Sequence, residues 1–193
     1  MRSNKITWLL AALVLAVTLL IAGCDSAAPA TGQTPAETPA KSAEQSQNPG
    51  TAPGAGQTMQ LTIYHATKDA MYLVPETHKV PVNSHPARTA IELLIAGTKN
   101  ANLVGVMPPG VKVKNVTVKD HVAYADFDDK LIKKGNGGSV SEILLVGAIV
   151  NTLTEFPDIQ KVQIMVDGKK IDTITGHLDV SEPLSRSEQI IKK

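Results

Sequence analysis

A long stretch without large apolar side chains divides this chain. Residues Asp25–Thr58 contain no Val, Ile, Leu, Met or aromatic residue and consist mainly of Ala, Pro, Gly, Ser, Thr and Gln. Such a segment cannot bury enough apolar surface to offset the loss of its conformational entropy, so we expect a disordered tether. Globular structure is therefore confined to Met59–Lys193, a length that suits one domain.

Charge and cysteine content exclude several kinds of function. The net charge is +1, and basic and acidic side chains stay nearly balanced within Met59–Lys193. Nucleic-acid binding normally requires a strong basic excess, so no nucleic-acid partner is expected. Cys24 is the one cysteine, and it cannot by itself form an intrachain disulfide or a cysteine metal cluster.

The N-terminal segment predicts export to a membrane. Arg2 and Lys5 precede the apolar run Ile6–Ala22. This run is marginal for a bilayer-spanning helix but ample for the hydrophobic region of a signal peptide. It continues into Gly23 and Cys24, and the sequence Leu20–Cys24 resembles the lipobox of bacterial lipoproteins.

The lipobox resemblance implies a defined processing event. Residues 1–23 would form a signal peptide cleaved between Gly23 and Cys24, and the Cys24 thiol would carry a diacylglyceryl group inserted in the lipid bilayer. Residues 24–58 would then tether the domain 59–193 to the extracytoplasmic face of the cell membrane. The alternative is an uncleaved N-terminal anchor helix with an incidental buried cysteine. Both interpretations place the protein at a membrane, outside the cytoplasm.

Local patterns in the third segment predict strands joined by tight turns. Alternating or continuous apolar runs indicate the strands, and Asp-His and Asp-Gly pairs indicate two-residue hairpin connections. The predicted strands and turns are Gln60–Tyr64, Met71–Val74, two valine-rich runs on either side of Asp120-His121, and Lys161–Val166 followed by Asp167-Gly168 and Lys169–Ile174.

Two helices are predicted between these strands. Pro86 begins the first and Gly97 follows its last turn. The second begins with a capping-box pattern, in which Ser139 and Glu142 would satisfy backbone amides of the first turn, and it stops at Pro157. The order ββαββαββ predicts an α+β fold, with a small, mostly antiparallel sheet and both helices on one face.

The second helix is apolar on more than one side. A broad arc of large apolar residues is expected to pack on the sheet. The opposite side is small and nearly uncharged, and we expect it to pack beside the first helix; the alternative is a partner-docking surface. The residues of this candidate partner surface are Leu144, Gly147, Ala148 and Asn151.

Several blocks resemble the GerMN domain of sporulation and spore germination proteins. The strongest are Ile149–Pro157 and Val162–Lys169. The other blocks, in the family's order, are Tyr72–Pro75, Pro108–Gly110, Ala123–Phe127 and Gly176–Leu184. The resemblance implies a single-domain lipoprotein linked to sporulation, germination or envelope assembly, with no established catalytic residues. Its expected partners are envelope or sporulation proteins, with peptidoglycan as a further candidate. The topology is also similar to a ring-building motif of secretion and sporulation channel proteins, a likeness of element order alone.

Few residues suggest catalysis or metal binding. Asp126, Asp128 and Asp129 cluster at a strand end, but their spacing does not fit a calcium loop, and we expect structural or solvated carboxylates. The histidines show no metal-ligand spacing and are expected on the surface or in turns, so no metal or cofactor is predicted. They are His65, His78, His85, His121 and His177.

Three functions follow from these patterns. The first is a lipid-tethered, non-catalytic interaction module, because the chain has a domain signature without a catalytic constellation. The second is a lipoprotein that binds peptidoglycan or a small solute, as tethering outside the cytoplasm would allow. The third is an envelope hydrolase, for which the Asp126–Asp129 cluster is the only motive.

Overall fold

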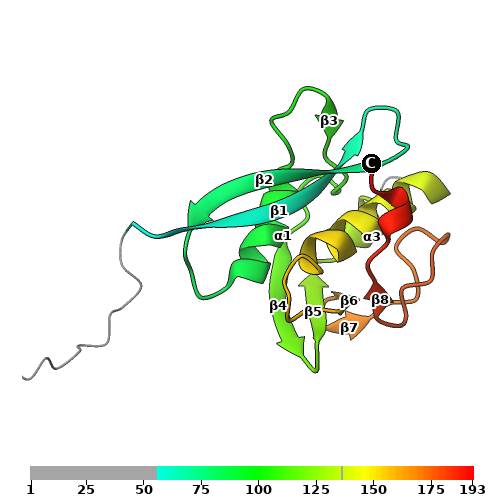
Figure 1. Cartoon of the computed structure of the whole chain (residues 1–193). Coiled ribbons are helices and arrows are strands. Elements are labelled where there is room, and N and C mark those ends of the chain that lie inside the picture. The colour runs from blue at the N-terminus through cyan, green and yellow to red at the C-terminus, as the bar shows by residue number, and fades with distance from the viewer. Residues whose placement is uncertain (1–55, 136) are drawn as a thin grey trace, which may run out of the picture. The chain divides into compact units, whose positions relative to one another are not determined.

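The computed structural model describes residues 56–135 and 137–193 (Figure 1). Its strands and helices alternate in short groups along the chain. The elements are β1 (Thr58–Thr67), β2 (Leu73–Pro81), α1 (Pro86–Ala96), β3 (Leu103–Val104), β4 (Val113–Lys119), β5 (Val122–Phe127), α2 (Lys130–Lys133), α3 (Ser139–Leu153), β6 (Lys161–Val166), β7 (Lys169–Lys170), β8 (Leu184–Ser185) and a final 3₁₀ turn (Glu188–Ile190).

Tight turns connect the strands as predicted. Asp120 and His121 have φ of 51° and 62°, and Asp167 and Gly168 have φ of 50° and 75°. Two successive residues with positive φ are the signature of a type I′ turn, whose twist matches that of a hairpin. The turns join β4 to β5 and β6 to β7, so both predicted hairpins are confirmed, although β7 is shorter than expected.

The strands form two sheets and not the single sheet that we predicted. One sheet has the order β2-β1-β3; the other has the order β4-β5-β6-β7, with β8 also paired to β6. Among the strands of the described residues, only β5 and β6 pair in parallel, because α2 and α3 carry the chain back between them; the other strand pairs are antiparallel. The fold is therefore α+β, as predicted, with short elements added to the expected order.

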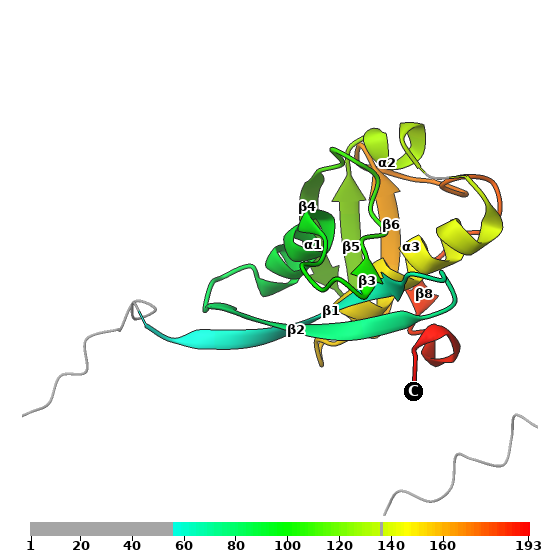
Figure 2. The same cartoon turned by 90° about the horizontal axis from the view of Figure 1, so that it is seen from above.

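The helices α1 and α3 lie between the two sheets. Both contact β1 of the first sheet; α1 also contacts β4 and α3 contacts β6 of the second. In Figure 1 the β1–β2 hairpin passes above the two helices and the second sheet lies below them, and Figure 2 shows the same arrangement from above. This three-layer arrangement explains why α3 is apolar on almost every side.

Helix bounds follow the predicted signals closely at one helix and less closely at the other. α1 begins at Pro86, and Gly97, with φ of 79°, follows it and donates its N–H to the carbonyls of Leu93 and Leu94. α3 begins at Ser139 but ends at Leu153, before the predicted stop at Pro157. The capping-box prediction is wrong: no side chain caps the N-terminus of α3, and Glu142 has another role.

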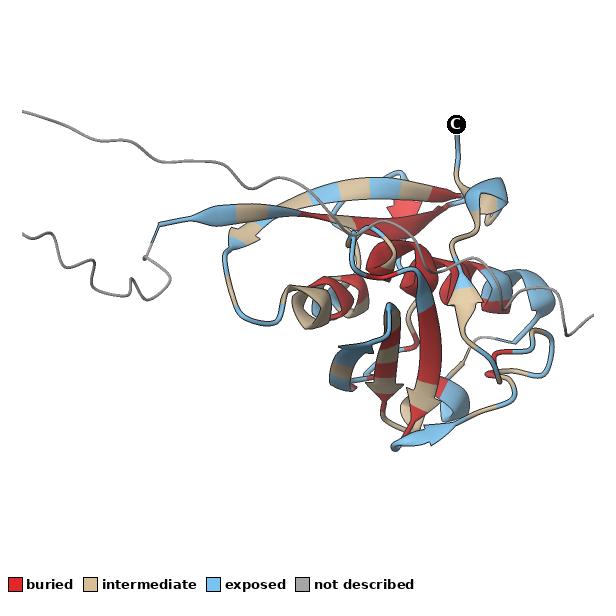
Figure 3. Cartoon of the chain, turned by 60° about the horizontal axis from the view of Figure 1, so that its bottom comes forward, coloured by how far each residue is buried: buried red, intermediate tan, exposed pale blue. Residues whose placement is uncertain are grey.

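The core is continuous across the three layers. Buried residues run from β1 through α1 and α3 to β5 and β6, and Figure 3 colours them red on the ribbon. The fully buried large side chains include Phe127, Ile149 and Ile164. Among the residues that the structure describes, none of the helices has both the length and the apolar character needed to cross a membrane.

Candidate functional site

The predicted lipidation site and signal cleavage site lie outside the described residues. Gly23 and Cys24 belong to the first 55 residues, so the structure does not test either. Lipid attachment at Cys24, and the membrane location that depends on it, remain predictions.

The candidate partner surface on α3 is not a surface. Leu144 is 4% exposed, Ala148 and Asn151 are 0% exposed, and Gly147 is buried. The small side chains face another part of the same chain, so the alternative of a partner-docking surface is wrong for these four residues.

The C-terminal segment covers this side of α3. Asn151 Nδ2 donates to the carbonyl of Ser187 at 3.0 Å, and the Ser187 N–H donates to Asn151 Oδ1 at 2.9 Å. A Cβ added at Gly147 would lie 2.2 Å from Cδ1 of Ile190 and 3.4 Å from Cδ1 of Leu73. Glycine at position 147 therefore allows the C-terminal segment to approach the helix closely.

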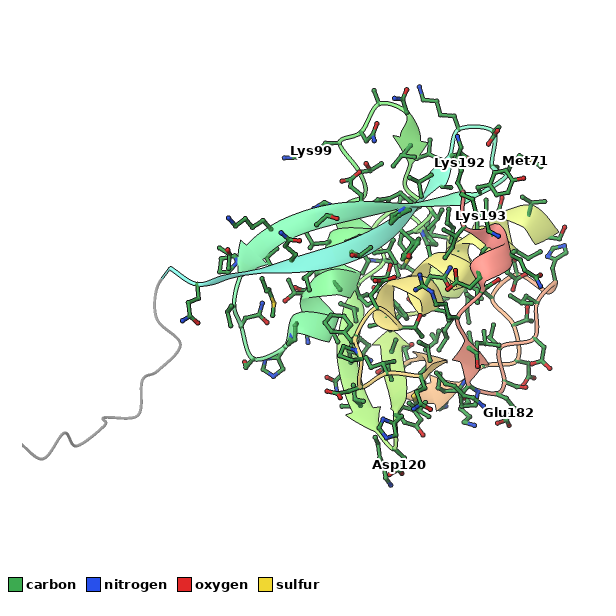
Figure 4. All side chains as sticks on the ribbon, viewed as in Figure 1. Met71, Lys99, Asp120, Glu182, Lys192 and Lys193 are labelled. Carbon is green, nitrogen blue, oxygen red and sulfur yellow. The ribbon has the colours of Figure 1, made fainter. Side chains whose placement is uncertain are left out.

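The same segment reaches the hairpin turn of the first sheet. The Lys192 N–H donates to the Leu73 carbonyl at 2.8 Å, and Ile191 forms a parallel bridge with Leu73. In Figure 4 the labelled side chains of Met71, Lys192 and Lys193 accordingly lie near one another. The C-terminal residues thus form part of the folded domain.

The three aspartates at the end of β5 hold local structure. Asp126 Oδ1 accepts from the Gly168 N–H at 2.8 Å, and Asp128 Oδ1 accepts from the Lys112 N–H at 3.1 Å. Asp129 pairs with Lys133 one helical turn later. These contacts assign the carboxylates to turns and a short helix, in agreement with the structural role that we expected.

Glu142 forms an extensive polar network inside the domain. Its side chain is fully buried and points from α3 to the loop 173–177. Oε1 accepts from the N–H groups of Ile174 and Thr175, both at 2.9 Å, and from the Thr173 hydroxyl at 2.8 Å. Oε2 accepts from the His177 N–H at 2.8 Å and from the Thr175 hydroxyl at 2.7 Å.

This network favours the charged carboxylate. Burial by itself would raise the pKa of Glu142, but the N–H and hydroxyl groups of Thr175, the Thr173 hydroxyl and the His177 N–H together lower it to about 2. Hydrogen bonds to a carboxylate stabilise its ionised form, and here they outweigh desolvation. Glu142 is therefore an ionised anchor for the loop that precedes β8.

A second polar network joins β1, the turn that follows α3 and the C-terminal segment. The Tyr64 hydroxyl donates to Glu155 Oε1 at 2.8 Å, and Arg186 Nη1 lies 2.8 Å from the same oxygen. The Arg186 guanidinium carbon also lies 5.2 Å from the centre of the Tyr64 ring. Burial and the hydrogen bond to Glu155 raise the pKa of Tyr64, which stays neutral at ordinary pH.

The hairpin β1–β2 brings together two histidines and a glutamate. A ligand atom from each of His65, Glu76 and His78 lies within 4.8 Å of the other two. His65 is 0% exposed, so the expectation that all histidines lie on the surface or in turns is wrong. Burial lowers the pKa of His65, which is therefore neutral near pH 7.

Pairing register explains why the histidine cluster was missed. The sequence positions of His65, Glu76 and His78 show no metal-ligand motif, because their proximity depends on which residues of β1 and β2 face each other. One signal was available: His65 follows Leu61 and Ile63 at alternate positions, so strand periodicity places it on their inward face.

Comparison with known proteins relates this chain to a protein family. A family model described as "Germane: Sporulation and spore germination" matches residues 62–172, which is more than half of the chain. The spore germination protein GerM of Bacillus subtilis (strain 168) is 28% identical over 142 residues. That match covers 70% of this chain but only 38% of the GerM protein.

Solved structures show the same relationship. The first GerMN domain of the sporulation protein GerM from Bacillus subtilis superposes with a TM-score of 0.58 and 27% identity, covering 66% of this chain and 98% of that domain. The tandem GerMN domains of the same protein give a TM-score of 0.58 and 26% identity, covering 67% of this chain and 46% of the tandem. The chain belongs to the Germane family of sporulation and spore germination proteins.

Proposed function

We propose that this chain is a lipid-anchored lipoprotein whose domain binds other proteins of the cell envelope during sporulation or spore germination. The observation that carries the proposal is the match of the family model to residues 62–172. The likeness to nearly the whole of the first GerMN domain of GerM supports it. The lipobox-like sequence that ends at Cys24 supports attachment to the outer face of the cell membrane.

The contacts of the candidate catalytic acids favour binding over catalysis. A general acid or nucleophile needs a carboxylate that can reach a substrate. Asp126 and Asp128 instead accept hydrogen bonds from backbone N–H groups, and Asp129 is paired with Lys133. We therefore infer that the domain acts through its surface, as an interaction module.

Gene deletion and complementation test this proposal. A strain lacking the gene is scored for heat-resistant spores and for outgrowth of those spores, then complemented with the full chain or with Cys24→Ser. A matched control is Ser26→Ala, which changes a small polar residue two positions away. We expect the deletion to reduce spore yield or outgrowth, the control to restore it, and Cys24→Ser to restore it poorly because the protein receives no lipid.

Two results would contradict the proposal. If the deletion strain sporulates and germinates like its parent, the role in sporulation or germination is wrong. If cells fed labelled fatty acid incorporate no more label into the wild-type protein than into Cys24→Ser, lipid attachment at Cys24 is wrong. The alternative function, peptidoglycan binding, is tested by sedimenting the purified full chain with isolated cell wall. Retention of the protein on the wall would favour this alternative.

A further inference from the structure

The register of the first hairpin places a carboxylate between two imidazoles. Glu76 pairs with Ile63, while His65 lies two residues further along β1 and His78 two residues further along β2, opposite Leu61. Side chains at alternate positions of paired strands share one face of a sheet. His65, Glu76 and His78 thus converge on one face, with the carboxylate in the middle.

His65, the buried residue of this group, has two ring nitrogens without hydrogen-bond partners in the part of the chain that the structure describes. His65 is 0% exposed, and neither Nδ1 nor Nε2 has a hydrogen-bond partner among the described residues. A buried polar group without a partner is unusual in a folded protein, because desolvation is then not compensated. The ring nitrogens of His65 are therefore available to bind a ligand.

The distances also suit a metal ion. His78 Nε2 lies 2.9 Å from Glu76 Oε1 but without the alignment of a hydrogen bond, and one ligand atom from each residue lies within 4.8 Å of the other two. Tetrahedral Zn²⁺ with ligands at about 2.1 Å places its donors about 3.4 Å apart. Ligand atoms within 4.8 Å of one another are close to the spacing that one such ion requires.

A neighbouring residue orients the carboxylate. The Thr98 hydroxyl donates to Glu76 Oε2 at 2.5 Å, so the other oxygen, Oε1, is directed to His78. Hydrogen bonds of this kind position the ligands of most protein metal sites. The side chains of Glu76 and His78 are 22% and 23% exposed, so the cluster lies close to solvent, which would let an ion enter.

We propose that His65, Glu76 and His78 bind one divalent transition-metal ion, for which Zn²⁺ is the best fit. Two imidazoles and one carboxylate are a donor set that selects first-row transition metals, whereas Mg²⁺ and Ca²⁺ require mainly oxygen ligands. The site is independent of the proposed role in sporulation, since none of the three residues enters the argument for that role.

Metal titration of the full chain tests the site. The chain is prepared in mild detergent with Cys24→Ser, which removes the only thiol, and is freed of metal with a chelator. Equilibrium dialysis against Zn²⁺ is compared for this protein and for His78→Gln, Glu76→Gln and Thr98→Val. His85→Gln is the matched control, because His85 is exposed and bonded to Ser84.

We expect one Zn²⁺ per chain and a higher Tm with the metal. His78→Gln and Glu76→Gln should weaken binding by more than about 100-fold, and Thr98→Val by about 10-fold, as expected for a residue that only positions a ligand. His85→Gln should bind like its parent. Mg²⁺ and Ca²⁺ should neither bind tightly nor raise the Tm.

A measurement on the unsubstituted site covers the case in which a variant fails to fold. Co²⁺ in place of Zn²⁺ should give the visible absorption of four- or five-coordinate cobalt with nitrogen and oxygen donors. The proposal is overturned if the protein binds no Zn²⁺, if binding is the same in His78→Gln and Glu76→Gln as in the parent, or if cobalt shows only its aqueous spectrum.

Discussion

Two buried polar clusters in this domain differ in how completely their atoms are bonded. The carboxylate of Glu142 accepts hydrogen bonds from three backbone N–H groups and two threonine hydroxyls. The ring of His65 is equally buried, yet neither nitrogen has a partner among the described residues. A satisfied network stabilises one conformation, whereas an unsatisfied one costs stability until a ligand completes it. Glu142 is therefore a structural anchor, and His65 belongs to a binding site.

Removal of the Glu142 carboxylate should have the largest effect. Glu142→Ala leaves the N–H groups of Ile174, Thr175 and His177 without their acceptor. The free energy of unfolding should fall by about 3–5 kcal/mol, as when one partner of a buried charged network is deleted. Urea unfolding of the full chain in detergent measures this change.

An exposed glutamate provides the control for that experiment. Glu92 lies on α1 and pairs with Arg88 one turn earlier, where both side chains are well exposed. Glu92→Ala should cost no more than about 0.5 kcal/mol. Equal losses in Glu142→Ala and Glu92→Ala would show that the buried network contributes nothing special.

Acid should weaken the same anchor without any mutation. The pKa of Glu142 is about 2 in the folded chain and 4.5 for an ordinary glutamate. Because the folded value is the lower one, the stabilisation is complete above pH 4.5 and is lost as the pH falls toward 2. The loss should be about 3 kcal/mol.

Glu142→Gln separates this titration from those of other carboxylates. Urea midpoints measured from neutral to strongly acidic pH should fall less steeply in the variant than in the wild type. Parallel curves for the two proteins would contradict the assignment of this acid sensitivity to Glu142.

A smaller satisfied network should give an intermediate effect. Asn151→Ala removes both hydrogen bonds to Ser187 and should cost about 2 kcal/mol. It should also make the last residues of the chain more accessible to protease, since Asn151 holds them against α3. Asn115→Ala, on an exposed position of β4, is the control. Unchanged proteolysis in Asn151→Ala would contradict this role of the C-terminal segment.

In the cluster of His65, Glu76 and His78, removal of the unpartnered ring should increase stability instead of lowering it. His65→Leu replaces a buried, unpartnered ring by an apolar side chain of similar size, and in metal-free protein it should raise the free energy of unfolding by about 1 kcal/mol. His85→Leu, at an exposed position, should change it by less than about 0.5 kcal/mol. A loss in His65→Leu as large as that in Asn151→Ala would contradict the comparison.

Local signals predicted several elements of the fold. Type I′ turns at Asp120-His121 and Asp167-Gly168, and the bounds of α1 at Pro86 and Gly97, depend on the backbone preferences of a few adjacent residues. Such preferences act within one turn of the chain, so a sequence pattern can identify them. Family membership was also predicted, from several short blocks in a fixed order.

Contacts between residues far apart in the sequence explain the predictions that were wrong or missing. Ser139 and Glu142 match a capping box, but Glu142 is held by groups 31 to 35 residues downstream. The small side of α3 suggested a neighbouring helix or a partner, yet the chain's own C-terminal segment covers it. The histidine cluster likewise depends on strand register, which single positions do not specify.

One NMR titration compares the two buried clusters directly, because each contains a histidine. His177 Nδ1 lies 3.2 Å from Glu142 Oε2, while His65 and His78 belong to the unsatisfied cluster. Ring signals of all histidines are followed as Zn²⁺ is added to the full chain carrying Cys24→Ser. The account predicts that the ring signals of His65 and His78 shift together until one equivalent of Zn²⁺ has been added, and that the ring signal of His177 does not shift. Shifts of His177 alone, or of none of the three, would contradict it.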